Sequence, residues 1–287
     1  MDITVENLDH WYGKGTPFEK KALTNISLHI ASKSYTAIIG HTGSGKSTLV
    51  QHMNGLLKPT AGTIKVGTHV IEGGKKSKDM KDLRRSVGFV FQYPEHQLFD
   101  ETVEKDIAFG PVNFGMSEEL AKKKAREVLH KVGLPADVLH RSPFELSGGQ
   151  KRRAAIAGVL AMTPSVLILD EPTAGLDPKG RRDIMNLFYQ LHQEEGLTTV
   201  LVTHNMLDAA LFADHIYVMD AGEIAMQGTP AEIFASTKEL QKIGLDVPES
   251  VQMIEMVEKQ FQVQMKRDVF TSLAVAEEID KHICYKE

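Results

Sequence analysis

The stretch from Gly40 to Thr48, GHTGSGKST, limits what this chain can fold into more than any other. It matches the phosphate-binding pattern G-x-x-x-x-G-K-[ST] at every fixed position. An apolar strand over 35–39 precedes it and a helix over 46–56 follows it, a context that a chance match in a flexible linker would lack. The predicted binding residues of this loop are Gly40, His41, Thr42, Gly43, Ser44, Gly45, Lys46, Ser47 and Thr48.

The residue types in this loop predict binding of the phosphates of a nucleotide together with Mg²⁺. Glycines let backbone N–H groups turn toward phosphate oxygens, and the N-terminus of the following helix adds partial positive charge. Lys46 would reach the β- and γ-phosphates, and the Ser47 hydroxyl would hold the magnesium ion.

Charge, cysteine content and hydropathy narrow the class of protein. The formal net charge of -5 provides no general basic field, so no nucleic-acid partner is expected. Cys284 is the one cysteine, which excludes an intrachain disulfide. The longest apolar run, 154–162, is shorter than the roughly 18–20 residues that cross a bilayer. Any link to a membrane is therefore expected through a partner.

The order of apolar segments predicts an α/β fold. Continuous apolar strands over 87–91, 166–169 and 199–202 are typical of a mainly parallel sheet covered on both faces. Alternating apolar residues near the N-terminus, before the phosphate loop, predict an additional antiparallel β region. Asp220-Ala221-Gly222 between two short strands predicts a hairpin.

Helical patterns fill the region from 101 to 160 and return later in the chain. Ser117 is the expected N-cap of a helix. Its predicted apolar face is Leu120, Ala121, Ala125, Val128, Leu129 and Val132. Another helix is predicted over 183–195, and a polar, solvated loop over 73–81. Two short amphipathic helices are predicted in the C-terminal extension, on Val251, Ile254, Met256 and Val257, and on Leu273, Val275, Ala276 and Ile279.

Polar residues follow the ends of several predicted strands. Gly40, Gln92, Asp170 and His204 occupy such positions, and ligand sites in parallel sheets lie at the carboxyl ends of the strands. One crevice is therefore expected to hold all four. Asp170 would help to hold Mg²⁺, and Glu171 would polarise the water that attacks the γ-phosphate. A strand-end helix cap is the simpler alternative for this acidic pair.

A second anion site is predicted at Ser147, Gly148, Gly149 and Gln150, before the helical run 151–162. A hydroxyl and N–H groups at a helix N-terminus attract anions. The simplest explanation for a second anion site is that it binds the nucleotide of another subunit.

Together these motifs resemble the ATPase subunit of ATP-binding-cassette (ABC) transporters. In this resemblance Gln92 is the glutamine loop and a magnesium ligand, 146–150 is the signature, and 166–171 is the Walker B segment. Residues 174–177, ending in Asp177, are the D-loop, and His204 is the switch. Tyr12 matches the aromatic residue that stacks on adenine. For the neighbouring Trp11, a place in the hydrophobic core is the alternative role.

The resemblance implies a P-loop ABC domain over 3–246, with a helical signature subdomain over about 95–160. It leaves 247–287 as a small helical extension, for which we expect a dimer-stabilising role. Glu171 and His204 would be the catalytic residues.

Further segments resemble the second, A-prime ATPase subunit of energy-coupling-factor (ECF) transporters. They are 15–19, 41–43, 91–99 and 141–145. The resemblance implies a heterodimer with a second related ATPase, a transmembrane T subunit and an S subunit that binds a vitamin or transition-metal ion. It places the chain peripherally on the cytoplasmic face of the cell membrane. A homodimer of this chain is the alternative to the heterodimer. The transported substrate cannot be named from these residues.

Two alternatives differ in class from a transport motor. One is a soluble ABC-type ATPase that acts on DNA or ribosomes, and the other is a non-hydrolysing nucleotide-binding partner subunit. Intact Glu171, His204 and Ser147 argue against the second. Aromatic and apolar residues among charges over 93–99 predict a surface that faces the membrane subunit.

Overall fold

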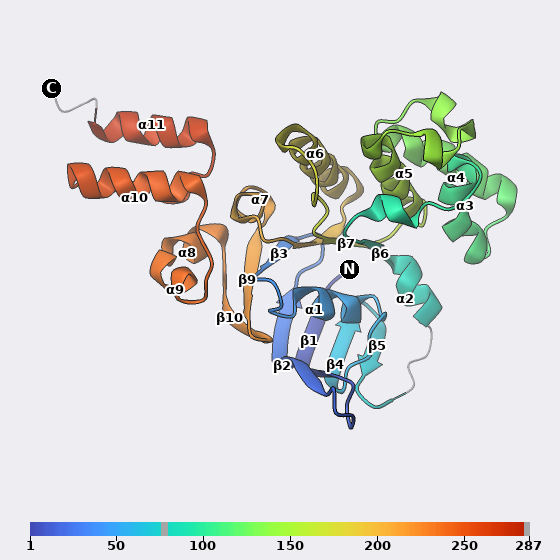
Figure 1. The fold of residues 1–287 in the computed structure, drawn as a ribbon, viewed down its shortest axis with the longest axis horizontal. Helices are drawn as coiled ribbons and strands as arrows, with labels where there is room; N and C mark the ends of the chain where they lie inside the picture. Colours follow the sequence, from blue (N-terminus) through green and yellow to red (C-terminus); the bar gives the residue numbers. More distant parts are fainter. Residues whose placement is uncertain (76–79, 284–287) are drawn as a thin grey trace.

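The central layer of the molecule is a six-stranded sheet (Figure 1). The computed structural model describes residues 1–75 and 80–283, so that Cys284 and part of the predicted loop over 73–81 lie outside the described residues. The strands lie in the spatial order β10 (Glu223–Gly228), β9 (His215–Asp220), β3 (Tyr35–Ile39), β8 (Thr198–Val202), β7 (Val166–Asp170) and β6 (Val87–Val90). All neighbours pair in parallel except β9 and β10, which form the predicted hairpin.

Both faces of this sheet are buried, which explains the continuous apolar strands. Side chains alternate along each strand, so that Leu167, Leu169 and Leu201 join the core beneath α5 and α6. Ile168 and Val200 face the opposite way and join a second core. The predicted mainly parallel sheet is thereby confirmed.

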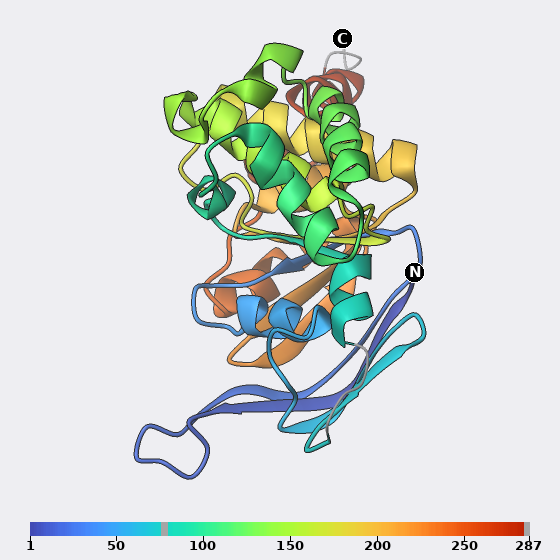
Figure 2. The same ribbon diagram turned by 90° about the vertical axis from the view of Figure 1, so that its right-hand side faces the viewer.

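The second core lies between the central sheet and an antiparallel sheet of four strands (Figure 2). Its order is β2 (Lys20–Ile30), β1 (Ile3–Tyr12), β4 (Ala61–Val66) and β5 (His69–Glu72). Helix α1 (Lys46–Met53) contributes Leu49, Val50 and Met53 to this core. The helix ends earlier than the predicted 56, since Gly55 turns the chain with a φ of 68°.

A group of helices projects at one end of the molecule. It comprises η1 (Pro94–Gln97), α3 (Val103–Asn113), α4 (Glu118–Lys131), η2 (Ala136–His140), η3 (Pro143–Glu145) and α5 (Gly148–Leu160). Ser117 caps α4 as predicted, by accepting a hydrogen bond from the Leu120 N–H. The prediction that Leu120 belongs to the apolar face was wrong, because its side chain is 57% exposed. The buried positions of α4 begin at Ala121, about 100° further round the helix.

Other helices flank the sheet, namely α2 (Met80–Ser86), α6 (Pro178–Glu195) and α7 (Met206–Phe212). Helix α6 begins earlier than the predicted 183. Asp177 accepts a hydrogen bond from the Gly180 N–H at 2.8 Å, and Pro178 occupies the first helical position. This cap and proline together are a strong helix start that the apolar periodicity alone does not reveal.

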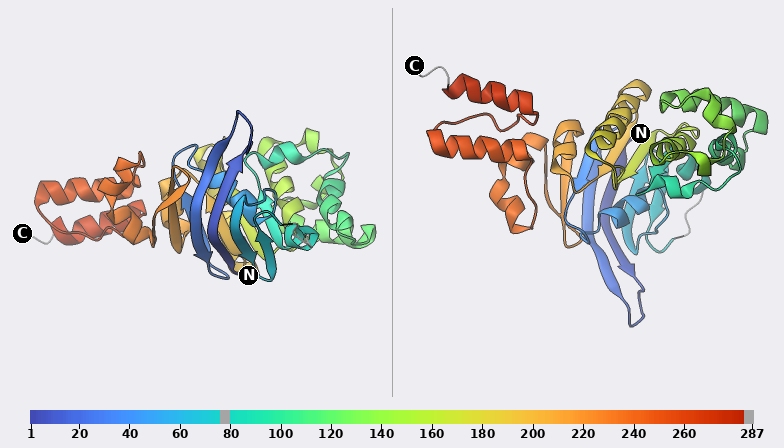
Figure 3. Two further views of the ribbon diagram at one scale, coloured as in Figure 1. Left: turned by 90° about the horizontal axis from the view of Figure 1, so that it is seen from below. Right: turned by 45° about the horizontal axis from the view of Figure 1, so that its top comes forward.

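The C-terminal helices lie at the end opposite the α3–α5 group (Figure 3). They are α8 (Pro230–Ala235), α9 (Thr237–Lys242), α10 (Glu249–Phe261) and α11 (Ser272–Ile283). The last two share a small core of Ile254, Met265 and Val275. Met256, Leu273 and Ala276 were wrongly predicted to be on the apolar faces, since all three are exposed. Among the described residues, no helix combines the length and apolar character needed to cross a bilayer.

Candidate functional site

The phosphate-loop motif connects β3 to α1 at the carboxyl edge of the central sheet. Gly40 and Gly45 have φ angles of 156° and 101°. A Cβ atom on Gly40 would lie 2.3 Å from the Met219 carbonyl oxygen, and one on Gly45 would lie 2.9 Å from the Ala22 carbonyl oxygen. The close approach of neighbouring backbone therefore requires glycine at both positions.

Lys46 is held inside the loop. Its side chain is 8% exposed, and its Nζ donates to the carbonyl oxygens of Gly40 at 2.8 Å and His41 at 3.0 Å. Burial lowers the pKa of Lys46, whereas the nearby Glu171 and Asp170 raise it. The loop thus keeps a cation beside two carboxylates at the end of β7.

The end of β7 meets the start of α1. The Ser47 hydroxyl donates to Asp170 Oδ1 at 3.1 Å. Burial raises the pKa of Asp170 most, the Ser47 hydrogen bond lowers it, and Glu171 raises it further. These oxygen atoms are of the type that a hard divalent cation prefers. Within the part of the chain that the structure describes, no group of three His, Cys, Asp or Glu side chains forms a complete metal site.

Glu171 contacts His204 directly. The Glu171 Oε2 lies 2.7 Å from His204 Nδ1, with the carboxylate largely buried and the imidazole exposed. Glu171 has a φ of 52°, a region that costs a non-glycine residue of order 1–3 kcal/mol. Its N–H donates to the Val202 carbonyl oxygen at 2.9 Å, so the neighbouring strand holds this turn in place.

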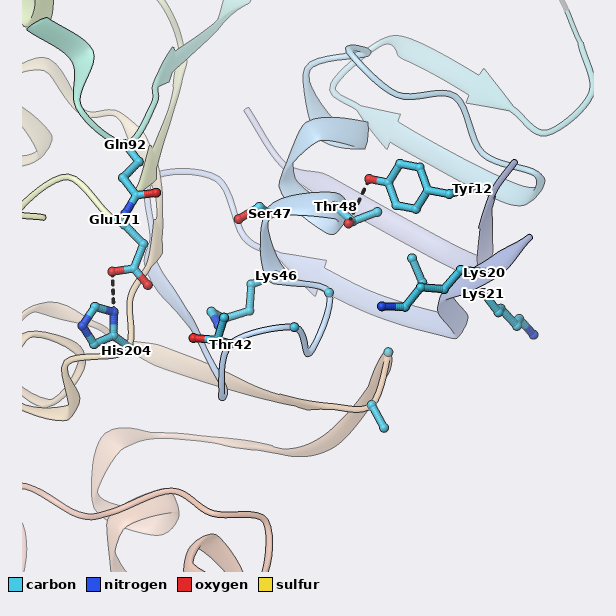
Figure 4. Close-up of a pocket in the computed structure, with 15 residues that line it drawn as sticks. Tyr12, Lys20, Lys21, Thr42, Lys46, Ser47, Thr48, Gln92, Glu171 and His204 are labelled. Carbon is cyan, nitrogen blue, oxygen red and sulfur yellow. Dashed lines mark hydrogen bonds and ion pairs between the residues drawn. The ribbon is translucent and has the colours of Figure 1, made fainter. Parts of the chain in front are cut away.

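One cavity of about 620 Å³ collects most of the predicted site residues. In Figure 4, Gln92, Glu171 and His204 lie on one side, Tyr12 lies on the other, and the phosphate-loop residues lie between them. The predicted residues that line it are Tyr12, Thr42, Gly43, Gly45, Lys46, Ser47, Thr48, Gln92, Glu171 and His204. This volume is in the range of small-molecule sites.

The remaining residues of the predicted loop do not line the cavity. Ser44 is fully buried, and Gly40 packs against the Met219 carbonyl. His41 turns away toward Asp220 at the end of β9, with its Nε2 2.8 Å from Asp220 Oδ1. Its Nδ1 lies 2.8 Å from the Thr42 carbonyl oxygen. Since both ring nitrogens face acceptors, the doubly protonated imidazolium fits this position best.

We expect Asp220→Asn to lower the pKa of His41 toward the ordinary value of 6.5. The Thr42 carbonyl raises this pKa most and the Asp220 carboxylate next, while Lys46 opposes them. The charged His41 imidazolium is therefore present below the raised pKa, and its ion pair with the Asp220 carboxylate is lost as the pH rises through that pKa. Titration of the His41 imidazole by NMR measures the shift, and Asp137→Asn, at an exposed and distant site, is the control. An unchanged pKa in Asp220→Asn would contradict this account.

The signature segment lies apart from this cavity. Ser147 caps α5: its hydroxyl accepts from the Gln150 N–H at 3.4 Å, and its own N–H donates to Gln150 Oε1 at 3.1 Å. This reciprocal box fixes the start of the helix. Asp177 likewise caps α6 rather than lining the cavity. The structure therefore brings together the strand-end residues but not the signature or the D-loop aspartate.

Arg152, which was not singled out from the sequence, links the α5 helix to two loops. It is buried and donates to both carboxylate oxygens of Glu95, at 2.7 and 2.8 Å. It also donates to the Ala174 carbonyl oxygen at 3.0 Å. The arginine thereby joins the signature helix to the segment after Gln92 and to the segment before Asp177.

Cavity residues outside the predicted motifs come from one strand and one turn. Lys20, Lys21 and Ala22 open β2, where Lys20 lies opposite Tyr12. Ala221 and Gly222 form the turn of the β9–β10 hairpin. The Gly222 N–H donates to the Ser44 carbonyl oxygen at 3.1 Å. In the sequence, only a pair of lysines and a hairpin turn mark these cavity residues. Neither feature is specific for a ligand site.

Comparison with protein families gives a match to the ABC transporter family over residues 23–174. The chain is 58% identical over 267 residues to the energy-coupling factor transporter ATP-binding protein EcfA2 of Bacillus cereus, covering 93% of this chain and 91% of that protein. It is 59% identical over 274 residues to the EcfA2 of Halalkalibacterium halodurans, with 96% and 97% covered.

Solved structures agree with these relatives. One is cbiO1 from Clostridium perfringens, described as part of the ABC transporter complex cbiONQ, with a TM-score of 0.73 and 37% identity over 91% of this chain and 98% of that one. Another is the dimeric ATP-binding cassette MJ0796 in a post-hydrolysis state with ADP and Pi, with a TM-score of 0.70 and 31% identity over 79% of this chain and 98% of that one.

Proposed function

Since this chain belongs to the ABC transporter ATPases, in the group of energy-coupling factor transporter ATP-binding proteins, we propose that it powers import of a vitamin or transition-metal ion through a T subunit. One observation carries the proposal. Lys46, Ser47, Glu171 and His204 line one cavity and Asp170 contacts Ser47, while the signature helix begins elsewhere. This arrangement leaves half of a phosphate site to be completed by another chain.

The residues of the cavity have distinct proposed roles. Backbone N–H groups of the loop and the Lys46 ammonium bind the ATP phosphates, and Tyr12 stacks on adenine. Glu171 acts as general base toward the attacking water, and His204 contacts the γ-phosphate. The 2.7 Å contact between them would orient the imidazole relative to the carboxylate.

We propose that Ser47, Asp170 and Gln92 hold Mg²⁺. Ser47 and Asp170 already bring two oxygen ligands within 3.1 Å of one another, and Gln92 lines the same cavity. Such an ion would neutralise part of the charge on the phosphate oxygens. Ser47 and Asp170 fit it by donor type, since magnesium sites commonly combine a few protein oxygens with phosphate oxygens and water.

The start of α5 would face the γ-phosphate bound by a second ATPase chain. A Cβ atom on Gly148 or Gly149 would meet nothing within 4 Å, so no contact within the described residues requires glycine there. Close approach of another molecule would require it. Asp177, at the start of α6, is proposed to lie at the same interface. ATP would then favour a closed dimer, which hydrolysis releases.

A T subunit would dock beside the helical group. Phe99 is 59% exposed and packs its ring 5.0 Å from that of Phe109, while Leu98 is partly buried against the core. Both phenylalanines border a hollow of about 310 Å³ that is lined mostly by apolar residues. Exposed aromatic rings around an apolar hollow suit helix ends of a membrane protein. This docking would place the chain on the cytoplasmic face of the membrane, with the S subunit in the same complex.

Ser147→Arg tests the sandwich arrangement. We expect the variant to lose ATPase activity by about 10²–10³-fold in the presence of the partner ATPase and T subunit, because the arginine blocks the helix end and removes a donor. ATP binding to the isolated chain should be unchanged. Glu119→Arg, at the exposed start of α4, is the matched control, and a thermal melt checks the loss of the Ser147 cap.

Full activity of the dilute monomer, unaffected by Ser147→Arg, would exclude the sandwich. Activity that rises with the concentration of this chain alone would instead support a homodimer. Normal ATPase activity without any effect of a T subunit would favour the soluble ATPase that is not linked to transport.

A further inference from the structure

Two buried histidines lie directly behind the aromatic side of the cavity. His10 belongs to β1, two residues before Tyr12, and His52 belongs to α1, four residues after Thr48. His52 is fully buried and His10 nearly so. The His52 Nε2 lies 3.0 Å from the His10 Nδ1, and the two rings are nearly perpendicular.

Backbone acceptors determine where the protons of this pair lie. The His52 Nδ1 is 2.7 Å from the Thr48 carbonyl oxygen, which can only accept, so this nitrogen is the donor. In the neutral ring the His52 Nε2 is then an acceptor. The His10 Nδ1 faces this acceptor and also the Lys58 carbonyl oxygen at 3.3 Å, and it must therefore carry the His10 proton. The hydrogen bonds run in one direction, from His10 to His52 to Thr48.

Burial keeps both rings neutral, as this arrangement requires. It lowers the pKa of His52 to about 4 and also lowers the pKa of His10. Carbonyl oxygens of Thr48 and Lys58 oppose these shifts without reversing them. Protonation of His52 would place a second N–H against the N–H of His10, so neutral imidazoles are the stable form at pH 7.

His10 contacts Tyr12 directly, whereas His52 reaches Tyr12 only through Thr48. The His10 ring lies 4.6 Å from the Tyr12 ring at an angle of 81°, an edge-to-face contact. The Tyr12 hydroxyl lies 3.1 Å from the Thr48 Oγ1, and the carbonyl of the same threonine accepts from His52. Tyr12 itself is 41% exposed and lines the cavity. Its ring is thus held at one edge by His10 and at its hydroxyl by the helix that His52 braces.

We propose that His10 and His52 are positioning residues that hold Tyr12 in the orientation for stacking on the nucleotide base. The inference rests on the proposed role of Tyr12 in ATP binding. In this proposal the histidine pair affects binding of the nucleotide base, whereas the loop that holds Lys46 binds the phosphates. A substitution in the pair should therefore change affinity for the base without changing affinity for the phosphates.

His52→Ala is the test. We expect it to weaken ATP binding and raise KM by about three- to tenfold, the range for losing one aromatic contact, with little change in kcat. Binding of inorganic tripolyphosphate should be unchanged. His10→Phe should bind ATP better than His10→Ala, because phenylalanine restores the ring edge. The matched control is His192→Ala, which removes a similarly buried histidine from the other core.

Equal loss of ATP and tripolyphosphate binding in His52→Ala would overturn the proposal, since a distorted loop would explain it. An effect no larger than that of His192→Ala would also overturn it. If His52→Ala fails to fold, ¹⁵N NMR of the unaltered protein gives a second test. Both imidazoles should be neutral with Nδ1 protonated at pH 7, and a charged ring or the other tautomer would contradict the assignment.

Tyr12→Ala separates failure of this inference from failure of the proposed function. It should weaken ATP but not tripolyphosphate binding. If it does so while His52→Ala has no effect, the histidine pair is not a positioning device, although the base site stands. If Tyr12→Ala has no effect, the proposed base site itself is wrong.

Discussion

Glu171→Gln should bind ATP and hydrolyse it about 10²–10⁴-fold more slowly than the unaltered chain, the usual cost of losing a general base. The amide keeps the shape of the carboxylate, and the strained turn held by the Val202 carbonyl stays in place. What disappears is the negative charge beside His204, 2.7 Å away, and with it the ability to take a proton from water. Because binding persists while hydrolysis stalls, the ATP-bound dimer should accumulate.

Single-turnover hydrolysis and size-exclusion chromatography with ATP measure these two effects. Glu194→Gln makes the same isosteric change at an exposed position of α6 and should leave both unchanged. His204→Ala should also slow hydrolysis, because the imidazole would no longer contact the γ-phosphate. Near-normal turnover in Glu171→Gln would reassign this carboxylate to a structural role.

Lys46→Ala should abolish tight ATP binding. Truncating one member of a buried charge contact costs about 2–5 kcal/mol, or roughly 30-fold to several thousand-fold in affinity. The Lys46 ammonium is almost fully buried beneath the loop and close to the position proposed for the phosphates. It also donates to the Gly40 and His41 carbonyl oxygens, so the loop itself loses two internal hydrogen bonds.

Equilibrium binding of ATP measures this loss, with Lys123→Ala on the exposed face of α4 as the control. A thermal melt separates weaker binding from unfolding. An affinity equal to that of the unaltered chain would rule out the proposed phosphate contact.

The structure confirms the predictions that depended only on a short stretch of the chain. The strand, loop and helix around Gly40–Ser47 form as expected, as do the Ser117 cap and the β9–β10 hairpin. Each depends on backbone dihedral preferences or on a side chain that reaches only a few residues along the chain. Strand ends were also predictable, because continuous apolar blocks stop where polar residues follow. In a parallel sheet that was enough to expect Gly40, Gln92, Asp170 and His204 around one crevice. Gln92 and His204 line the cavity, and Gly40 and Asp170 contact its lining residues Lys46 and Ser47.

The apolar periodicity of the helices predicted burial wrongly for side chains that lie outside the buried face of the helix. Leu120 is exposed because it lies about 100° round α4 from the buried Ala121. Met256 and Leu273 are exposed because each lies about 200° round its helix from the nearest buried apolar residue, Ile254 and Val275 respectively. The start of α6 was missed for the opposite reason: its first turn carries no apolar pattern, and only the Asp177 cap with Pro178 marks it.

Tertiary structure alone decided which distant segments meet at the cavity. Lys20 lies there because β2 pairs with β1 in a register that sets it opposite Tyr12. His10 meets His52 because α1 packs between the two sheets, and His41 meets Asp220 because β9 lies beside β3. The sequence by itself determined the local elements and the residue types at strand ends, since those depend on neighbouring residues. Contacts between segments far apart depend on strand order, register and packing, which are settled only when the whole chain buries its apolar surface at once.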